Sequence, residues 1–348
     1  MVKYHLSRKY KNIIRRKYMW INVLLFAVGL VMLIKGGDWF VEGATGIARR
    51  FKIPELLIGA TVVSIGTTLP EVMVSATSAA QGIGGIAYGN ALGSIICNTA
   101  LIAAITITIK PGKVERSALK LPLIFFFGAA AIYCFTAYAF NRFDRISGII
   151  LLLVFLLYMT LTVLQMKRTP AEPALADGEP EAEHTSEAAS GSIVKDIVFL
   201  VLGAVLIAFG ADFLVDNGTV IAKELGVPDA VIGLTFVAIG TSLPELVTAI
   251  TSLVKGHGAL SLGNIIGANL FNLVLVSGIS ITINPFDVPA ASLIGGIPSS
   301  FIIDIPVMLA VMLLMTVPAF VRKKLERWQG IALLLIYAAF FTLQFVLA

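Results

Sequence analysis

Ten long apolar stretches follow one another along the chain, separated by short polar segments. A helix needs about 20 predominantly apolar residues to cross the hydrocarbon core of a bilayer, and each stretch has roughly that length. They cover residues 20–44, 55–79, 86–109, 119–139, 146–164, 193–215, 229–254, 259–283, 300–321 and 328–347. The pattern predicts an all-α polytopic membrane protein with ten transmembrane helices.

The composition agrees with this pattern. Of the 348 residues, 57% are hydrophobic and only 14% are charged, whereas soluble domains average about half and a quarter. We therefore interpret the net charge of +5 as a signal of membrane topology and not as a nucleic-acid-binding surface. Cys97 and Cys134 both fall inside apolar stretches, which indicates small buried side chains rather than a disulfide or a metal site.

The basic residues predict the orientation. Loops after the odd-numbered spans carry most of the Lys and Arg, and the opposite loops carry only Arg142, Arg145 and Lys223. Because cytoplasmic loops are enriched in Lys and Arg, we expect the odd loops in the cytoplasm and both termini outside the cell membrane. The basic leader, residues 1–19, opposes this orientation, and we interpret it as an unusual extension or a misassigned start.

A repeat runs through the chain. Residues 38–98 align without a gap with residues 212–272, and about two in five positions are identical, including Gly, Thr, Pro, Glu and Asn. Five predicted spans separate equivalent positions. Because five is odd, the second copy must cross the membrane in the opposite direction. We expect two inverted five-helix repeats, residues 20–165 and 193–348, joined by an acidic cytoplasmic linker at residues 166–192.

Each copy places a glutamate beside a proline in an apolar span, in GTTLPEV (66–72) and GTSLPEL (240–246). A carboxylate inside a membrane helix costs about 2.5–3.5 kcal/mol on insertion scales, so Glu71 and Glu245 are candidate functional residues. One interpretation is a protonated glutamate that bonds to a neighbouring helix. The other is a carboxylate that binds a cation, and the oxygen donors nearby favour the cation.

These donors surround the proline. Pro70 lacks a backbone N–H and its ring crowds the preceding turn, so we expect free carbonyl oxygens from Ser64 to Thr67. The Thr67 hydroxyl shares a helix face with Glu71, four residues on. The second copy supplies equivalent oxygens from Ala238, Thr241 and Glu245. Carbonyl, hydroxyl and carboxylate oxygens suit a hard cation such as Ca²⁺.

The next span of each copy, GNALGSIICN (89–98) or GNIIGANLFN (263–272), carries a stripe at every fourth position. The stripes are Asn90, Ser94 and Asn98 in the first copy and Asn264, Ala268 and Asn272 in the second. Helix packing explains the glycines of these segments, but it does not explain asparagines inside a membrane, whose amide oxygens can coordinate cations. We predict that four helices, two per copy, surround one chamber.

The doubled motifs resemble the two alpha repeats of the calcium:cation antiporter superfamily, in particular its sodium/calcium exchanger branch of prokaryotic type. The resemblance extends over most of the ten spans and implies an antiporter that exchanges Na⁺ for Ca²⁺ by alternating access, without a cofactor. It implies Ca²⁺ ligands at Glu71, Glu245, Thr67, Thr241 and the carbonyls of Ser64 and Ala238. It also implies that Thr68, Ser242, Ser94, Asn98 and Asn272 line flanking Na⁺ sites.

The sequence departs from the family pattern at two positions. Ala268 stands opposite Ser94, where family members often have a hydroxyl in both copies. Asn272 stands where the potassium-dependent branch has an aspartate, which argues against transport of K⁺. The proton-coupled branch usually has an acid in this helix, where Gly93 and Gly267 occur here. A proton-coupled cation exchanger is therefore the alternative function.

Two other classes fit less well. A channel would share this composition, but it more naturally forms a pore on the axis of an oligomer, whereas a duplicated, inverted chain builds its site by itself. An intramembrane enzyme would need a Ser–His, Cys–His or paired-aspartate motif, and the spans show none. We expect a transporter that is not an enzyme and functions as a monomer, with Ca²⁺, Na⁺ and the lipid bilayer as partners and no nucleic acid.

The predicted orientation can be tested by labelling. A cysteine introduced at Ser186 should react with a membrane-impermeant maleimide only from the cytoplasmic side, because the basic odd loops flank the linker. The parent chain, whose two cysteines lie in apolar stretches, controls for background labelling. Labelling from the outside would reverse the orientation and would agree with the basic leader instead.

Overall fold

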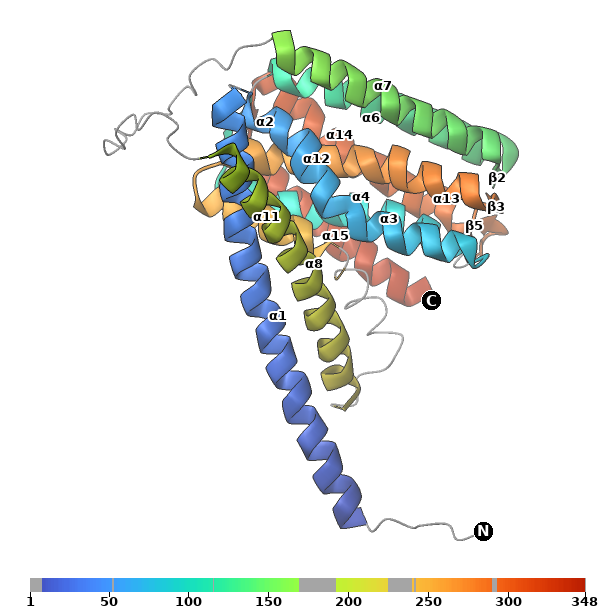
Figure 1. The fold of residues 1–348 in the computed structure, drawn as a ribbon. Coiled ribbons are helices and arrows are strands. Elements are labelled where there is room, and N and C mark those ends of the chain that lie inside the picture. Colours follow the sequence, from blue (N-terminus) through green and yellow to red (C-terminus); the bar gives the residue numbers. More distant parts are fainter. Residues whose placement is uncertain are drawn as a thin grey trace.

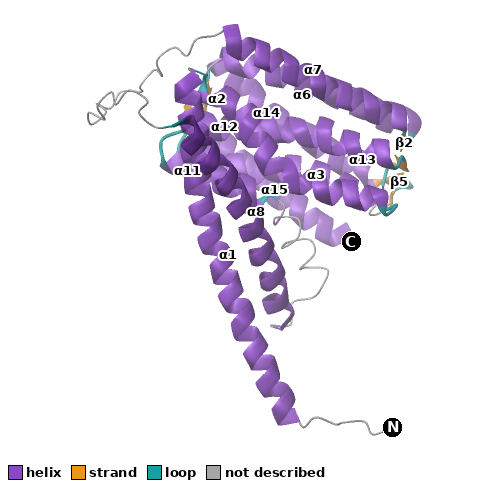
Figure 2. Ribbon diagram, in the orientation of Figure 1, coloured by secondary structure: helices purple, strands orange, loops and turns teal. Residues whose placement is uncertain are grey.

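The computed structural model describes residues 8–51, 53–114, 116–168, 192–224, 240, 242–289 and 293–347, and these residues are almost entirely helical (Figures 1 and 2). Within them, eight helical segments are long and apolar enough to cross a membrane. These segments are Met19–Phe51, Leu56–Ala80, Gly84–Ile109, Leu119–Phe140, Arg145–Gln165, Ile193–Gly210, Gly258–Ile283 and Ser300–Arg322.

The helices include short π-helical segments, labelled η, in which each turn holds one extra residue. The first half contains α1 (Arg8–Phe51), α2 (Glu55–Ile58), η1 (Gly59–Val63), α3 (Ser64–Ala80), α4 (Gly84–Cys97), η2 (Asn98–Ala103), α5 (Ala104–Ile109), α6 (Arg116–Phe140) and α7 (Arg145–Arg168). The second half contains α8 (Ile193–Glu224), α11 (Leu243–Val254), α12 (Gly258–Phe271), η4 (Asn272–Val276), α13 (Ser277–Ile283), η5 (Ser300–Asp304), α14 (Ile305–Arg322) and α15 (Arg327–Leu347).

The apolar stretches predicted where these helices lie, but several helices extend beyond the predicted boundaries: α1 ends at Phe51 and not at residue 44, and α8 ends at Glu224 and not at residue 215. No proline precedes Pro54, and α1 accordingly runs unbroken from Arg8 to Phe51, so residues 8–19 of the predicted leader continue into the first span. Its 44 residues make it about 66 Å long. Helix α7 likewise extends to Arg168, beyond the predicted start of the linker at residue 166.

The predicted count of ten spans is only partly visible. Of the predicted seventh span, residues 229–254, residues 229–239 and 241 lie outside the described residues, and the described remainder contains the helix α11 (Leu243–Val254). The predicted tenth span corresponds to the 21-residue helix α15. The rest of the predicted linker, residues 169–191, also lies outside the described residues.

Helices α1 and α8 lie side by side and antiparallel, with the end of α1 beside the start of α8, and the pair crosses the other helices obliquely (Figure 1). Glycines allow the two backbones to touch. A Cβ atom added to Gly36 would lie 2.9 Å from the backbone nitrogen of Ile207. At the equivalent positions of the repeat, a Cβ atom on Gly210 would lie 2.9 Å from the nitrogen of Leu33. Equivalent residues of the two helices therefore make equivalent backbone contacts with each other.

Equivalent contacts also attach the last helix of each half to the other half. Arg145, at the start of α7, donates from Nε to the carbonyl oxygen of Thr282 in α13 (3.0 Å). Arg327, at the start of α15, donates from Nε to the carbonyl oxygen of Thr108 in α5 (2.9 Å). Each arginine binds free carbonyls at the end of a helix, where a positive charge is favourable.

Three short strand pairs complete the fold. Strand β1 (Gly112–Lys113) pairs with β6 (Lys324–Leu325), β2 (Arg142–Phe143) pairs with β3 (Phe286–Asp287), and β4 (Leu293–Ile294) pairs with β5 (Ile297–Pro298), all antiparallel. The first two ribbons each join a loop of one half to a loop of the other. In each of these two ribbons, one strand is preceded by a residue in the left-handed conformation: Asn141 precedes β2, and Lys323 precedes β6. The carbonyl oxygen of each accepts a hydrogen bond from a backbone N–H of the partner loop.

The apolar interior has two parts. The larger cluster lies among α4 to α7 and α11 to α15, and it includes Phe126, Phe271 and Met312, each fully buried. The smaller cluster lies between the α1–α8 pair and η1, around Phe40. The chamber residues described below lie where these two parts meet.

The close approach of α1 and α8 yields a stability prediction. A Cβ atom on Gly203 would lie 2.4 Å from the backbone nitrogen of Phe40, so Gly203→Ala must separate the two backbones. Overpacking of this kind typically costs about 1–3 kcal/mol, and we expect a lower melting temperature in thermal unfolding of the purified protein. Gly128→Ala in α6, where no described atom lies within 4 Å of the new carbon, is the matched control. Equal melting temperatures for the two variants would contradict the predicted tight packing.

Candidate ion-binding site

Glu71 and Glu245 are the only charged side chains that are buried within the described part of the chain, and each has an exposed fraction of 0%. Glu71 lies in α3 and Glu245 in the first turn of α11. The two carboxyl groups face each other across the interface between the two halves, close enough for a charge on one to disfavour a charge on the other. The structure thus brings together the two carboxylates that the repeat predicted.

The polar atoms around these carboxylates lack hydrogen-bond partners among the described residues. This holds for both carboxylate oxygens of each glutamate, for the side-chain amide atoms of Asn98 and Asn272, and for the hydroxyls of Thr68 and Ser242. Buried polar groups are almost always hydrogen-bonded in native proteins, because an unpartnered one costs free energy. Such a concentration of unpartnered oxygens is the arrangement expected for a site that a cation completes.

The asparagines come from equivalent π-helical segments. Asn98 is the first residue of η2, and Asn272 is the first residue of η4. Segment η2 packs against α11, and η4 packs against α3, so each half sets its asparagine against the glutamate helix of the other half. Single π-helical turns in membrane and soluble helices often mark functional sites.

Two further asparagines hold the chamber helices in place. Asn264 Oδ1 accepts a hydrogen bond from the Thr67 hydroxyl (3.2 Å), which ties α12 to α3 across the two halves. Ser64 Oγ donates to the Gly59 carbonyl oxygen (2.7 Å) and lies 3.3 Å from the same Asn264 atom. Asn90 Nδ2 donates to the carbonyl oxygen of Glu71 (3.2 Å) and to Ser75 Oγ (2.8 Å). Both asparagines therefore brace the helix that carries Glu71.

The predicted opened turn from Ser64 to Thr67 is not where the helix is irregular. Helix α3 continues through Pro70, and the widened turn lies just before it, in η1. The proline still removes the N–H that would bond to the carbonyl of Gly66. The Ser64 carbonyl, a predicted ligand, accepts a long contact from Thr67 Oγ1 (3.5 Å).

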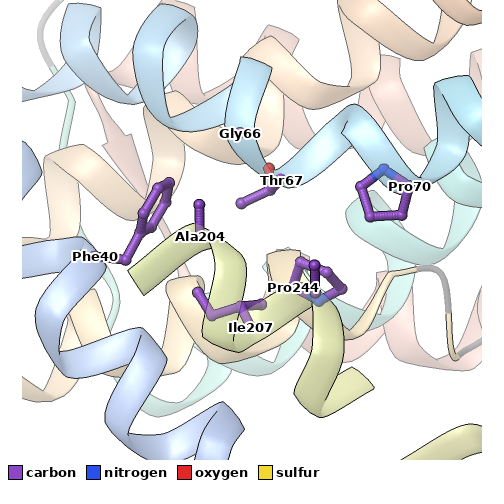
Figure 3. A pocket seen from close by; sticks show the side chains of 8 residues that line it. Phe40, Gly66, Thr67, Pro70, Ala204, Ile207 and Pro244 are labelled. Atoms are coloured by element: carbon purple, nitrogen blue, oxygen red, sulfur yellow. The ribbon is translucent and has the colours of Figure 1, made fainter. Parts of the chain in front are cut away.

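A small cavity adjoins the chamber on the side of the α1–α8 pair (Figure 3). Its volume is about 10 Å³, close to the space that a single water requires. The cavity is lined by Gly66, Thr67 and Pro70 of α3 on one side and, opposite them, by Phe40 of α1, Ala204, Ile207 and Ala208 of α8, and Pro244 of α11. Apolar side chains of α1 and α8 therefore separate the chamber from the lipid-facing side.

The remaining predicted site residues are placed as follows. Ser94 is buried at 3% exposure in α4, and Thr67 lies beside Glu245 while it donates to Asn264. Ala238 and Thr241 lie outside the described residues. Sequence reasoning missed Asn269, which donates from Nδ2 to Thr99 Oγ1 (2.7 Å) and Met312 Sδ (3.2 Å) behind the chamber. Its repeat equivalent is Ile95, so the repeat gave no signal for it.

This set of donors suits a hard cation. Within the described ranges, no three His, Cys, Asp or Glu side chains gather in one place, so a cation would depend on neutral oxygens besides the two carboxylates. Carboxylate, hydroxyl, amide and carbonyl oxygens are the usual ligands of Ca²⁺. Two carboxylates also match the charge of one divalent cation.

Comparison with known proteins identifies the family. The family model for sodium/calcium exchanger proteins matches the chain twice, over residues 21–164 and 195–346. The chain belongs to the sodium/calcium exchanger family. It is a multi-pass membrane protein of that family, as the doubled motifs indicated, and the prediction that it belongs to the exchanger branch is confirmed.

Individual relatives span almost the whole chain. The sodium/calcium exchanger MaX1 of Methanosarcina acetivorans is 33% identical over 93% of this chain and 99% of its own length. The inner membrane protein YrbG of Escherichia coli is 32% identical over 91% of this chain and 94% of its own. A solved structure of the sodium–calcium exchanger NCX_Mj, soaked with Na⁺ and Sr²⁺, superimposes with a TM-score of 0.77 at 32% identity, covering 92% of this chain and 98% of that one.

The bracing role of Asn264 can be tested by substitution. Asn264→Leu keeps the branching of the side chain but removes the amide, so the buried Thr67 hydroxyl loses its shorter acceptor, at a typical cost of about 1–3 kcal/mol. We expect a lower melting temperature and weaker Ca²⁺ binding, measured by calorimetry on the purified protein. Thr342→Val, which removes an exposed hydroxyl bonded only within α15, should change neither. Unaltered stability and Ca²⁺ binding in Asn264→Leu would show that the bridge is dispensable.

Proposed function

We propose that this chain is a secondary antiporter of the cell membrane that exchanges Na⁺ for Ca²⁺ by alternating access, independently of K⁺. The observation that carries the proposal is the pair Glu71 and Glu245, both fully buried and both without a hydrogen-bond partner among the described residues. Family membership and the cargo named for MaX1 and NCX_Mj support the choice of ions.

Charge balance supports exchange of these two ions at one chamber. Glu71 and Glu245 together carry two negative charges when ionised, which one Ca²⁺ or two Na⁺ neutralise. Because Coulomb energies are large at low dielectric, a chamber without cations is disfavoured by repulsion between the carboxylates. Either ion therefore relieves the same repulsion, and occupation by one competes with occupation by the other.

The ligands proposed for Ca²⁺ are Glu71, Glu245, Thr67 and Thr241, with the carbonyls of Ser64 and Ala238. Those proposed for Na⁺ are Thr68, Ser242, Ser94, Asn98 and Asn272. The unpartnered atoms of Thr68, Ser242, Asn98 and Asn272 support this second group. The neutral amide of Asn272 supports independence from K⁺, since it adds no third charge to the chamber.

The proposed fold is two inverted five-helix repeats, and the loop ribbons support it. Strands β2 and β3 pair, so the loops that follow α6 and α13 lie on one face, and the chain between them crosses the membrane an even number of times. Three described segments, Arg145–Gln165, Ile193–Gly210 and Gly258–Ile283, account for three crossings. An even number of crossings supports the seventh span that the sequence predicts at residues 229–254.

Equivalent halves support alternating access as well. The α1–α8 contact and the two arginine caps recur in both halves, and similar contacts in both halves are what two interchangeable conformations would need. The chamber arises from two halves of one chain, which supports a functional monomer. The basic odd loops support a cytoplasmic linker and outside termini.

The coupling ion is tested in proteoliposomes. Ca²⁺ uptake should follow an imposed Na⁺ gradient, with or without K⁺ on either side and with the membrane potential clamped by an ionophore. A strict requirement for K⁺ would contradict the interpretation of Asn272. Uptake driven by a proton gradient and indifferent to Na⁺ would establish the proton-coupled alternative.

The carboxylates are tested by Glu71→Gln and Glu245→Gln, each of which leaves one charge to balance a divalent ion. We expect Na⁺-driven Ca²⁺ uptake to fall at least 100-fold in either variant, while the purified protein still folds. Glu42→Gln, at an exposed glutamate of α1 paired with Lys195, is the matched control and should transport normally. Normal exchange in either chamber variant would exclude it as a Ca²⁺ ligand.

A further inference from the structure

Asp304 is a carboxylate outside the chamber that the exchange proposal does not use. It ends η5, four residues into the segment Ser300–Arg322, near the loops that carry the β2–β3 ribbon. Gln344 Nε2 of α15 donates to Asp304 Oδ1 (2.7 Å), and Ser300 Oγ lies 3.0 Å from Asp304 Oδ2. The widened π-helical turn brings Ser300 and Asp304 together on one side of the helix.

This cluster has fewer hydrogens than its oxygens need. Ser300 Oγ also lies 2.6 Å from the carbonyl oxygen of Pro289. A serine hydroxyl has one hydrogen, so it can donate to Pro289 or to Asp304, but not to both. When Asp304 is ionised, the other pair of oxygens faces each other without a hydrogen between them.

Tyr88 adds a third oxygen. Its side chain is 4% exposed, and its hydroxyl has no hydrogen-bond partner among the described residues. The ring packs against Phe143 of β2, with centroids 6.3 Å apart, and the hydroxyl lies beside Ser300 and Asp304. A buried, unpartnered hydroxyl is costly unless something outside the protein completes it.

We propose that Asp304, Ser300, Tyr88 and the Pro289 carbonyl form a second cation site, separate from the chamber and selective for a monovalent cation of the Na⁺ class. A cation supplies the positive partner that the oxygens lack, and it lets the single Ser300 hydrogen stay on Pro289. One carboxylate balances one positive charge, whereas a divalent ion would leave an excess charge among buried aromatic rings. The site does not depend on the proposed exchange.

The test separates this site from the chamber. In a protein carrying Glu71→Gln and Glu245→Gln, thermal unfolding is compared in NaCl and in choline chloride at equal ionic strength. A ligand that binds the folded state raises its stability, so we expect Na⁺ to raise the melting temperature. Adding Asp304→Asn should abolish this rise, and Tyr88→Phe should weaken the apparent Na⁺ affinity several-fold.

Tyr138 provides a matched control. Its hydroxyl donates to the carbonyl oxygen of Phe301, the residue after Ser300 in η5, and not to an atom of the cluster. Tyr138→Phe should therefore leave the Na⁺ effect unchanged. Equal melting temperatures in Na⁺ and choline, a Na⁺ effect that survives Asp304→Asn, or a stability that rises with acid and ignores Na⁺ would each overturn the proposal.

If the chamber variant fails to fold, crystals of the parent protein soaked in a Tl⁺ salt test by diffraction whether a monovalent cation binds at Asp304. Anomalous density between Asp304 and Ser300, absent in Asp304→Asn, is expected, and its absence in the parent would overturn the proposal.

Discussion

The repulsion between two buried carboxylates governs this structure. Glu71 and Glu245 are withdrawn from water, lie on opposite halves of the chain, and have no hydrogen-bond partner among the described residues. Ionised carboxylates in a low-dielectric interior are tolerated only with compensating charge, which is the physical reason that the proposed function places a cation between them. The surrounding helices hold neutral oxygens near the charges without neutralising them.

The polar side chains of the chamber divide into two groups with different tasks. Asn90 Nδ2, Asn264 Oδ1 and Asn269 Nδ2 each make hydrogen bonds that join helices, while Asn264 Nδ2 and Asn269 Oδ1 have no partner among the described residues. Asn98 and Asn272, one helical turn or more along the same segments, leave both of their amide atoms without such a partner. The bonded asparagines hold the chamber helices together, and the unpartnered amide oxygens of Asn98 and Asn272 remain available to an ion.

The described spans and the two buried carboxylates were predictable from the sequence, because equivalent motifs in a duplicated chain point to equivalent positions in the fold. Apolar run lengths placed the described spans, and the paired Glu–Pro motifs located the two carboxylates. The stripe at every fourth residue found the chamber asparagines, yet it gave Asn90 and Asn98 the same role, since spacing along one helix does not show what the facing helix offers.

The rest depended on tertiary contacts that a single chain pattern does not contain. The π-helical turn of η1 replaced the opened turn expected at Ser64–Thr67, because α3 passes through Pro70 without breaking. Asn269 has Ile95 at its equivalent position, so the comparison of the two repeats did not single it out. Asp304 lies in a span whose counterpart has no motif in the aligned repeat, and only its contacts with Ser300 and Gln344 single it out.

The exchanged contacts between the halves have an evolutionary consequence. A Cβ atom added to Gly148 of α7 would lie 2.6 Å from Thr282 Oγ1, and one added to Gly330 of α15 would lie 2.2 Å from Thr108 Oγ1, so the last helix of each half packs closely on the other half as well as on the helix before it. A half-length ancestor with these surfaces would leave them uncovered unless a second copy packed against it. The duplicated sequence and these exchanged contacts are what fusion of two such copies would leave.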